Sequence, residues 1–252
     1  FIEPHAHITI YGVNYMSISC KELGSIEELL AEISKKAQST EKGEWIRAWG
    51  YNELSVKEKR YPTIQELDRV TTEHPILITR ACGHISIVNS KALEMAGITK
   101  DTEQPVGGKI DKDSNGNLTG LLLESASSNM GITAKYTEDE MLRANKLTSE
   151  HFAEKGITSI HDAVGYGLDN LRMLQLSSKR NELKQRIYTM IGSLNNDRPI
   201  VEHIIDSGIF TGLGDNKFKI GPVKLFLDGS SSGPTIWTRE PYTSDPTNFG
   251  IH

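Results

Sequence analysis

The stretch Phe1-Ile2-Glu3-Pro4-His5-Ala6-His7 begins the chain with strand-like alternation, which we extend to Thr9. Side chains at positions i and i+2 of a strand point to the same face, so the imidazoles of His5 and His7 converge on one site. Neutral imidazole is a good ligand for zinc and neighbouring divalent metals. The residues alone leave two interpretations open, a metal site and a pair of hydrogen-bonded polar histidines.

The composition of the whole chain is that of an ordinary globular protein. The chain has 252 residues, 37% of them hydrophobic, and a net charge of −5, which predicts no binding to nucleic acid or to an anionic membrane. No apolar run approaches the roughly 20 residues that a membrane span requires. Cys20 and Cys82 lie far apart and form no metal or redox spacing. We expect buried thiols in a reduced, cytoplasmic protein.

Both ends of the sequence are unusual. The chain begins at Phe1 without a methionine, and it stops at His252 directly after a loop-rich stretch. We expect it to be a segment of a longer protein.

Three capping boxes predict where helices begin, because a Ser or Thr caps the helix and a Glu three positions later reaches back. They lie at 25–28, 63–66 and 137–140. Further helices are predicted over 90–97, 168–178 and 200–207. Apolar runs predict strands over 1–9, 45–51, 75–79, 85–88, 109–111, 118–123, 157–161, 186–191 and 218–226, the last as one bent strand or a pair.

These elements predict an α/β fold. From about Tyr136 strand and helix alternate, which is typical of βα units on a parallel sheet. The section 41–124 is richer in hairpin signals, such as the turn Asp113-Ser114-Asn115-Gly116-Asn117. We therefore divide the chain into a first βα unit over 1–40, a small α+β insertion over 41–124, and a continuation of the parallel sheet over 125–252.

Lys224 is an unusual residue, because it lies among Val223, Leu225 and Phe226 in a predicted strand. A buried ammonium group is costly unless it is paired or neutralised. The lysine can extend its charged end to water, pair with a carboxylate such as Asp228, or be carboxylated and so become an anionic oxygen ligand for two metals. The residues alone favour the first two explanations.

Further polar residues follow predicted strands. His161 and Asp162 close the strand 157–161, where they face a catalytic site or, equally, cap a helix. Arg80 and His84 follow the strand 75–79 and either meet an anionic or carbonyl substrate or have an internal structural role. Glu124 ends an apolar run, where a carboxylate needs a partner. The serine-rich run after Asp228 has neither the order of a phosphate loop nor a nucleophile elbow.

Taken together, these runs resemble the amidohydrolase superfamily and, within it, amidohydrolase family 3, which includes N-substituted formamide deformylases. The runs that carry the resemblance are 1–7, 49–52, 62–63, 67–68, 82–84, 88–93, 119–122 with Glu124, 156–162, 223–226, 228–229 and 240–242. They span nearly the whole chain in order, so the resemblance is specific for the family but not for a substrate.

The resemblance implies part of a (β/α)₈ barrel, about strands one to four, with a metal site at the C-terminal ends of its strands and a small α+β domain inserted. His5 and His7 match the first-strand metal ligands, and Lys224 matches a lysine that is carboxylated in many relatives. Further histidine ligands and an aspartate that carries protons are expected beyond His252. We assign Lys224, His161 and Asp228 to catalysis, and Arg80, His84 and Glu124 to substrate binding.

The function implied is hydrolysis of carbon–nitrogen bonds other than peptide bonds, by water activated on one or two divalent metal ions, with zinc as the expected ion. The expected partner is a small amide-type substrate. Unpaired strand edges suggest either a homo-oligomer or an edge that the insertion covers. We expect this chain alone to bind metal weakly and to have little or no activity. Two alternatives stay open, a non-catalytic binding module on the same scaffold and a metal-dependent deaminase or isomerase.

Overall fold

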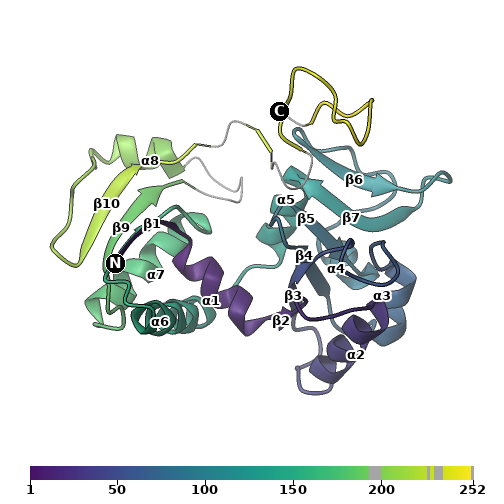
Figure 1. Cartoon of the computed structure of the whole chain (residues 1–252), viewed down its shortest axis with the longest axis horizontal. Coiled ribbons are helices and arrows are strands. Elements are labelled where there is room, and N and C mark those ends of the chain that lie inside the picture. Colours follow the sequence, from purple (N-terminus) through teal and green to yellow (C-terminus); the bar gives the residue numbers. More distant parts are fainter. Residues whose placement is uncertain (193–199, 226–227, 230–234, 251–252) are drawn as a thin grey trace. The chain divides into compact units, whose positions relative to one another are not determined.

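The computed structural model describes residues 1–192, 200–225, 228–229 and 235–250 of the chain (Figure 1). The chain forms two compact units. The first unit contains Phe1–Met16 and Lys135–Leu225, and the second contains Ser17–Ala134 and Phe226–His252. Each unit has its own sheet, one with four strands and one with six, so the mixed α/β class is confirmed.

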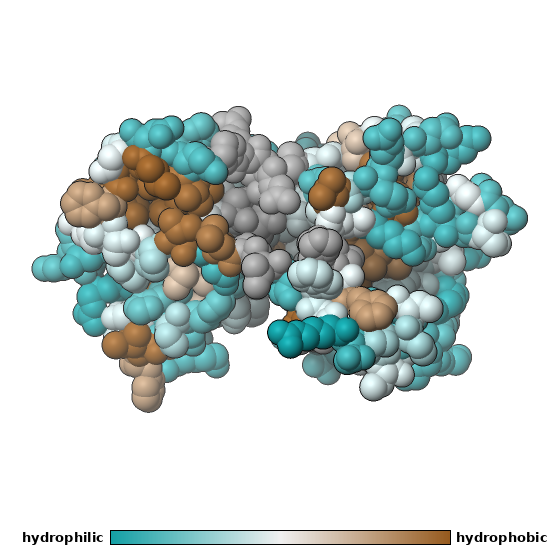
Figure 2. Space-filling model, turned by 90° about the horizontal axis from the view of Figure 1, so that it is seen from above, coloured by the Kyte–Doolittle hydropathy of each residue, from teal (hydrophilic) through white to brown (hydrophobic). Residues whose placement is uncertain are grey.

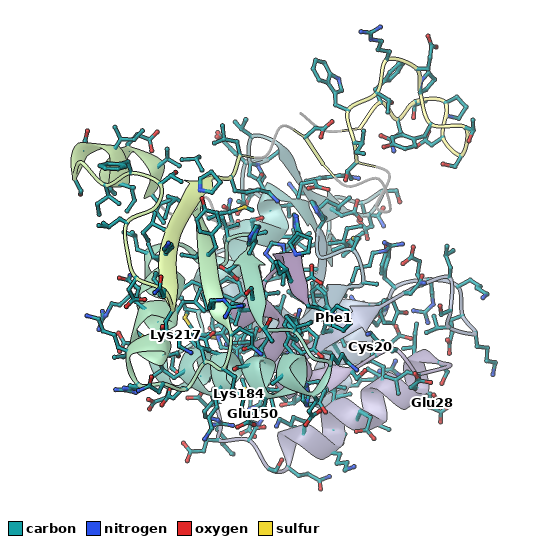
Figure 3. The ribbon with its side chains drawn as sticks, turned by 60° about the vertical axis from the view of Figure 1, so that its left-hand side comes forward. Phe1, Cys20, Glu28, Glu150, Lys184 and Lys217 are labelled. Atoms are coloured by element: carbon teal, nitrogen blue, oxygen red, sulfur yellow. The ribbon has the colours of Figure 1, made fainter. Side chains whose placement is uncertain are left out.

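The first unit is a parallel sheet with the strand order β1-β8-β9-β10. The strands are β1 (Ile2–Ala6), β8 (Ser159–Asp162), β9 (Arg186–Ile191) and β10 (Phe218–Val223), and the helices are α1 (Ile8–Met16), α6 (Glu138–Glu154), α7 (Gly167–Lys179) and α8 (Ile200–Asp206). Figure 3 shows Phe1, Lys184 and Lys217, which precede three of the strands, towards one end of this sheet. The C-terminal ends of the strands therefore meet at the opposite end.

The core of the first unit lies between the sheet and its helices. Ile160 of β8 and Ile187 of β9 pack with Leu174 of α7 and with Ile8 of α1. Within β8 and β9 these buried positions alternate with more exposed ones, so one face of each strand packs on the helices and the other is partly accessible.

Gly12 brings α1 and α6 into backbone contact. A Cβ atom at Gly12 would lie 2.2 Å from the carbonyl oxygen of Ala144, which is backbone and cannot move aside cheaply. We expect Gly12→Ala to lower the free energy of unfolding by about 2 kcal/mol, because the two helices must separate. Urea denaturation measures this. Gly24→Ala is the control, since the nearest atoms there are flexible carboxylate oxygens 3.8 Å away; an equal loss in both variants would contradict the prediction.

The strand predicted over 1–9 is wrong beyond Ala6, because β1 ends there and α1 begins at Ile8. The backbone N–H of Ile8 donates to the Asp162 carboxylate at 2.8 Å. This cap comes from another strand, so the local sequence gives no sign of it.

The second unit is a mixed sheet in the order β2-β3-β4-β5-β7-β6. Pairing is parallel from β2 to β4 and antiparallel from β4 onward. The strands are β2 (Ile18–Ser19), β3 (Ile46–Tyr51), β4 (Ile76–Arg80), β5 (Ile85–Val88), β6 (Gly108–Lys112) and β7 (Leu118–Glu124), and the helices are α2 (Ile26–Ala37), α3 (Ile64–Val70), α4 (Ser90–Met95) and α5 (Ser125–Thr133). The hairpin predicted around Asp113 is the β6–β7 turn.

The boundaries of the two units differ from the divisions expected from the sequence. Helix α2, which we had placed with the first βα unit, packs through Leu29 and Ile33 on Ile46 and Ile78 of the six-stranded sheet. The second unit therefore begins at Ser17 rather than at position 41, and its first segment continues to Ala134. An amphipathic pattern identifies a helix but not the sheet that its apolar face covers.

The capping boxes at Thr63 and Thr137 form as predicted, with reciprocal bonds to Glu66 and Glu140. At the third, Ser25 caps α2, but the Glu28 side chain accepts from the N–H of Gly24 instead. Helix α5 was not predicted, and its first residue follows Glu124, which makes no side-chain cap. None of the helices in the described ranges is both long and apolar enough to cross a membrane.

Candidate metal centre

His5 and His7 lie together at the C-terminal end of β1. Their rings meet edge to face, with centroids 5.4 Å apart and an interplanar angle of 76°. His5 is exposed and His7 is half-buried. The two imidazoles therefore share one place at the end of the sheet where the strands finish, as their spacing predicts.

The orientation of His7 is fixed by Val164. The Val164 carbonyl oxygen lies 2.7 Å from Nδ1 of His7. Because a carbonyl oxygen only accepts, Nδ1 carries the proton and Nε2 keeps a lone pair. A metal-binding histidine is commonly held in this way, with its second ring nitrogen donating to a carbonyl or carboxylate.

Val164 adopts a backbone conformation that its residue type avoids. Its φ is 71°, in the left-handed region, where a β-branched side chain is rare and costs on the order of 1–3 kcal/mol. The preceding residue is tied to β1, since the N–H of Ala163 donates to Ala6 at 2.6 Å. The strained turn after β8 thus directs a carbonyl at His7.

Burial lowers the pKa of His7, and the neighbouring charges of His5 and Lys224 lower it further, against the hydrogen bond to Val164, which raises it. The imidazole of His7 is therefore held in the neutral form that binds metals. Lys224 therefore lies within electrostatic range of His7.

Lys224 follows β10 and is half-buried. Its backbone N–H donates to the carbonyl oxygen of Ile191 at 2.8 Å, which fixes the chain where β9 and β10 end. A positive charge near two imidazoles opposes the binding of a metal cation. A carboxylated lysine would carry the opposite charge, and the carboxylation of Lys224 stays a prediction.

Asp162 is almost fully buried, with 1% of its surface exposed. Its Oδ1 accepts from the N–H of Ile8 at 2.8 Å, and its Oδ2 accepts from the hydroxyl of Thr189 at 3.1 Å. Burial raises its pKa to about 7, although both hydrogen bonds act in the opposite direction. Asp162 therefore joins β8, β9 and the start of α1 next to His7.

His161 precedes Asp162 and lies on the other face of β8. Its ring is 5.2 Å from that of Tyr188, the residue paired with it on β9. Tyr188 was not selected from the sequence, because a tyrosine in a strand is ordinary. The catalytic role of His161 stays a prediction.

Asp228 accepts the backbone N–H of Trp237 at 3.2 Å through Oδ2. Both residues belong to the second unit. The catalytic role of Asp228 stays a prediction.

Arg80 is occupied by a carboxylate that the sequence analysis missed. Its Nε and Nη2 atoms each donate to Glu53 at 2.9 Å, and the two side chains are 10% and 18% exposed. The hydrogen bonds to Glu53 raise the pKa of Arg80, so the guanidinium is charged and already compensated. A substrate contact at Arg80 stays a prediction, and an anion there would have to compete with Glu53.

His84 and Glu124, selected separately from the sequence, form a pair. Nδ1 of His84 lies 2.7 Å from Oε2 of Glu124. Glu124 ends an apolar run and needs a partner. That partner is His84, which precedes the neighbouring strand β5.

Comparison with known proteins decides the family. A family model described as the amidohydrolase family, Amidohydro_3, matches residues 1–252. The chain belongs to this family.

Relatives of this chain include YtcJ of Bacillus subtilis (strain 168), provisionally named an amidohydrolase, which is 28% identical over all of the chain and 47% of its own length. An N-substituted formamide deformylase of Arthrobacter pascens is 29% identical over 74% of the chain and 34% of its own length. The crystal structure of an uncharacterized metal-dependent hydrolase from Pyrococcus horikoshii OT3 matches all of the chain with a TM-score of 0.73 at 24% identity, over 47% of that structure. The chain spans half or less of the length of these proteins.

The described residues offer a donor set that fits a divalent metal in part. Among the described residues, no three His, Cys, Asp or Glu side chains gather closely enough to hold a metal ion. His5 and His7 supply two imidazoles, one of them with its Nε2 free by the bond to Val164. The pair suits zinc, but it needs further ligands to complete the coordination.

Proposed function

We propose that this chain contributes the first metal ligands of a hydrolase that cleaves carbon–nitrogen bonds other than peptide bonds. The observation that carries the proposal is the pair His5 and His7, with Nδ1 of His7 held by Val164 so that Nε2 is presented as a ligand. Membership of the amidohydrolase family supports the reaction class. The name of one relative, an N-substituted formamide deformylase, supports small amides as substrates.

We infer that the four-stranded parallel sheet is part of a (β/α)₈ barrel and that the segment between its first two strands, which contains the expected α+β domain over 41–124, is an insertion in it. The strand order and the helical crossovers support this inference. The ends of parallel barrel strands are where catalytic residues lie, and His5, His161 and Lys224 are all at or near such ends.

A bound divalent metal, with zinc as the expected ion, polarises a substrate carbonyl and lowers the pKa of water. His5 and His7 would hold it, and carboxylated Lys224 would add an anionic oxygen. His161 and Asp228 are the candidates for moving protons. Arg80, His84 and Glu124 are the candidates for binding the substrate.

The test compares this chain with the longest natural product of the gene that encodes it. We expect the chain alone to bind zinc weakly in calorimetric titration and to hydrolyse N-substituted formamides little or not at all. We expect the longest product to contain tightly bound metal by elemental analysis and to hydrolyse small amides. A longest product that binds no metal would contradict the proposal and favour a non-catalytic binding module.

We also expect the chain to self-associate. The exposed large apolar side chains of the first unit are concentrated in and after α8 and at the end of β10, and Figure 2 shows apolar surface on this unit. This group contains Ile205, Phe210, Leu213, Val223 and Leu225, whereas Phe1, Ile2, Tyr11 and Tyr15 are exposed elsewhere on the unit. Such a group of apolar side chains, near the end strand of a sheet, favours association. Sedimentation velocity is the measurement, and a monomer at all concentrations up to the limit of solubility would contradict the prediction.

A further inference from the structure

A second polar centre lies in the second unit, where His84 precedes β5 and Glu124 ends β7. The side chains are joined by the 2.7 Å contact between Nδ1 and Oε2, and the backbones by a 2.8 Å bond from the N–H of Glu124 to the carbonyl of His84. The Glu124 side chain is 11% exposed, whereas that of His84 is 33% exposed. The carboxylate is therefore the buried support and the imidazole is the accessible part.

Glu124 holds this position at a conformational cost. Its φ of 51° and ψ of −119° lie where non-glycine residues are sparse. Capping of α5 does not explain the strain, because the Glu124 side chain makes no cap hydrogen bond. Strained backbone persists where the surroundings impose it, and such positions cluster at ligand-binding sites.

The contact sets the chemistry of the imidazole. An ionised carboxylate only accepts, so Nδ1 of His84 carries the proton and Nε2, on the far side of the ring, is an acceptor. In the described part of the chain the His84 side chain bonds to Glu124, and its backbone N–H and carbonyl are engaged by the sulfur of Cys82 and the N–H of Glu124. Oε1 of Glu124 is buried and has no partner among these residues. The pair thus presents one accessible acceptor, oriented by a carboxylate.

Two other uses of the pair are disfavoured by its neighbours. The hydroxyls of Ser86 and Ser127 bond to each other at 2.6 Å, so neither is a nucleophile activated by His84. The nearby charge of Arg80 is compensated by Glu53, which disfavours capture of an anion. What the geometry provides is a site for a hydrogen-bond donor.

We propose that His84, positioned by Glu124, binds the N–H group of a secondary amide through Nε2. The choice of an amide as the ligand rests on the proposed function. The site itself rests on the contacts within the second unit, and it requires no metal. His84 is the residue that touches the ligand, and Glu124 is a positioning residue.

The experiment titrates N-benzylformamide into the metal-free chain labelled with ¹⁵N-histidine. Before addition, the His84 resonances are expected to report a protonated Nδ1 and an unprotonated Nε2. On saturation, the Nε2 resonance shifts, and N-benzyl-N-methylformamide, which lacks the N–H, binds about tenfold more weakly. His84→Ala is expected to weaken N-benzylformamide binding by a similar factor, whereas the control His203→Ala, on an exposed helix position of the first unit, leaves it unchanged.

Two variants of Glu124 separate positioning from simple structural support. Glu124→Gln keeps the shape and an acceptor oxygen, and we expect affinity to fall about threefold to tenfold as the preference for the Nδ1 proton weakens. Glu124→Gly removes the carboxylate from a backbone conformation that suits glycine. We expect its melting temperature to be unchanged or higher while the fixed proton position of His84 is lost. The control is Glu94→Gln, on a carboxylate that is 70% exposed.

The proposal is overturned if saturating N-benzylformamide leaves the His84 resonances unmoved, if the N-methylated amide binds equally well, or if His84→Ala retains full affinity. These outcomes are independent of the metal, because the chain is titrated without it. If His5 variants keep their metal, the proposed hydrolase is overturned but the amide-binding role of His84 is not. If His84 binds no amide, the proposed metal centre is unaffected.

Discussion

Replacing Asp162 with alanine is expected to lower the free energy of unfolding by about 3 kcal/mol at pH 5.5, among the larger losses for a single polar side chain. The variant leaves the N–H of Ile8 and the hydroxyl of Thr189 without their shared acceptor in a site that is 1% exposed. The variant also removes the carboxylate that accepts from the first N–H of α1, directly after His7. Urea denaturation followed by circular dichroism is the measurement. Thr189→Val, which removes one of the two donors and keeps the volume, should lose less than half as much.

The same residue gives a pH dependence with a definite sign. Burial raises the pKa of Asp162 from 3.8 to about 7, so between these values the folded protein holds a proton that the unfolded chain releases. Stability therefore falls as pH rises through this window, by up to about 4 kcal/mol, and is level above it. Asp162→Asn keeps an acceptor for Ile8 and removes the titration.

The Asp162→Asn variant is accordingly expected to have a higher free energy of unfolding than the parent at pH 8. It is also expected to lose less of that free energy between pH 5 and pH 8. The difference in slope between the two proteins isolates Asp162 from the other titrating groups. Parallel stability curves would show that the carboxyl group titrates normally in the folded state.

What the sequence predicts correctly here is local. The capping boxes at Thr63 and Thr137 are complete within four residues, so their helices begin where expected. The i, i+2 spacing of His5 and His7 likewise determines that both side chains point to one face of the strand, and their rings are neighbours. Hydrophobic alternation and residue spacing predict these features because they depend only on residues that are close together in the sequence.

What the sequence does not predict depends on partners far along the chain. Asp162 caps a helix that starts 154 residues earlier, and Glu53 pairs with Arg80 across 27 positions. Val164 is a residue type that gives no hint of a left-handed backbone, although its carbonyl decides the orientation of His7. Such contacts follow from the order of the strands, which hydrophobic patterning does not specify.

The placement of α2 shows the same division. The sequence locates the helix and its apolar face, yet the face packs on the six-stranded sheet rather than on the parallel one. Both sheets offer buried isoleucines at the right spacing, so composition does not distinguish them. The roles of Arg80, His84 and Glu124 are similarly invisible from position alone, whereas the contacts separate a compensated ion pair from an accessible imidazole.

The largest effect on activity is expected from His7. In the longest natural product of the gene, His7→Ala should abolish tightly bound metal and lower kcat/KM for an N-substituted formamide by at least about a thousandfold, because a metal that activates water supplies several kcal/mol of transition-state stabilisation. His7 is the proposed ligand whose ring is oriented by Val164, so its loss is expected to remove a positioned donor rather than a mobile one. His5→Ala should likewise lower the metal content and kcat/KM.

His7→Gln separates loss of the ligand from damage to the fold. Its amide can still donate to the Val164 carbonyl while offering no imidazole, so its unfolding free energy should stay within about 1 kcal/mol of the parent, with metal and activity lost. The control His203→Ala changes an exposed histidine of the same unit and should leave metal content and rate unchanged. Full metal occupancy in His7→Ala, measured by elemental analysis after exhaustive dialysis, would remove His7 from the metal centre. The strained turn at Val164 would then need another explanation, because its carbonyl would be orienting an imidazole that holds nothing.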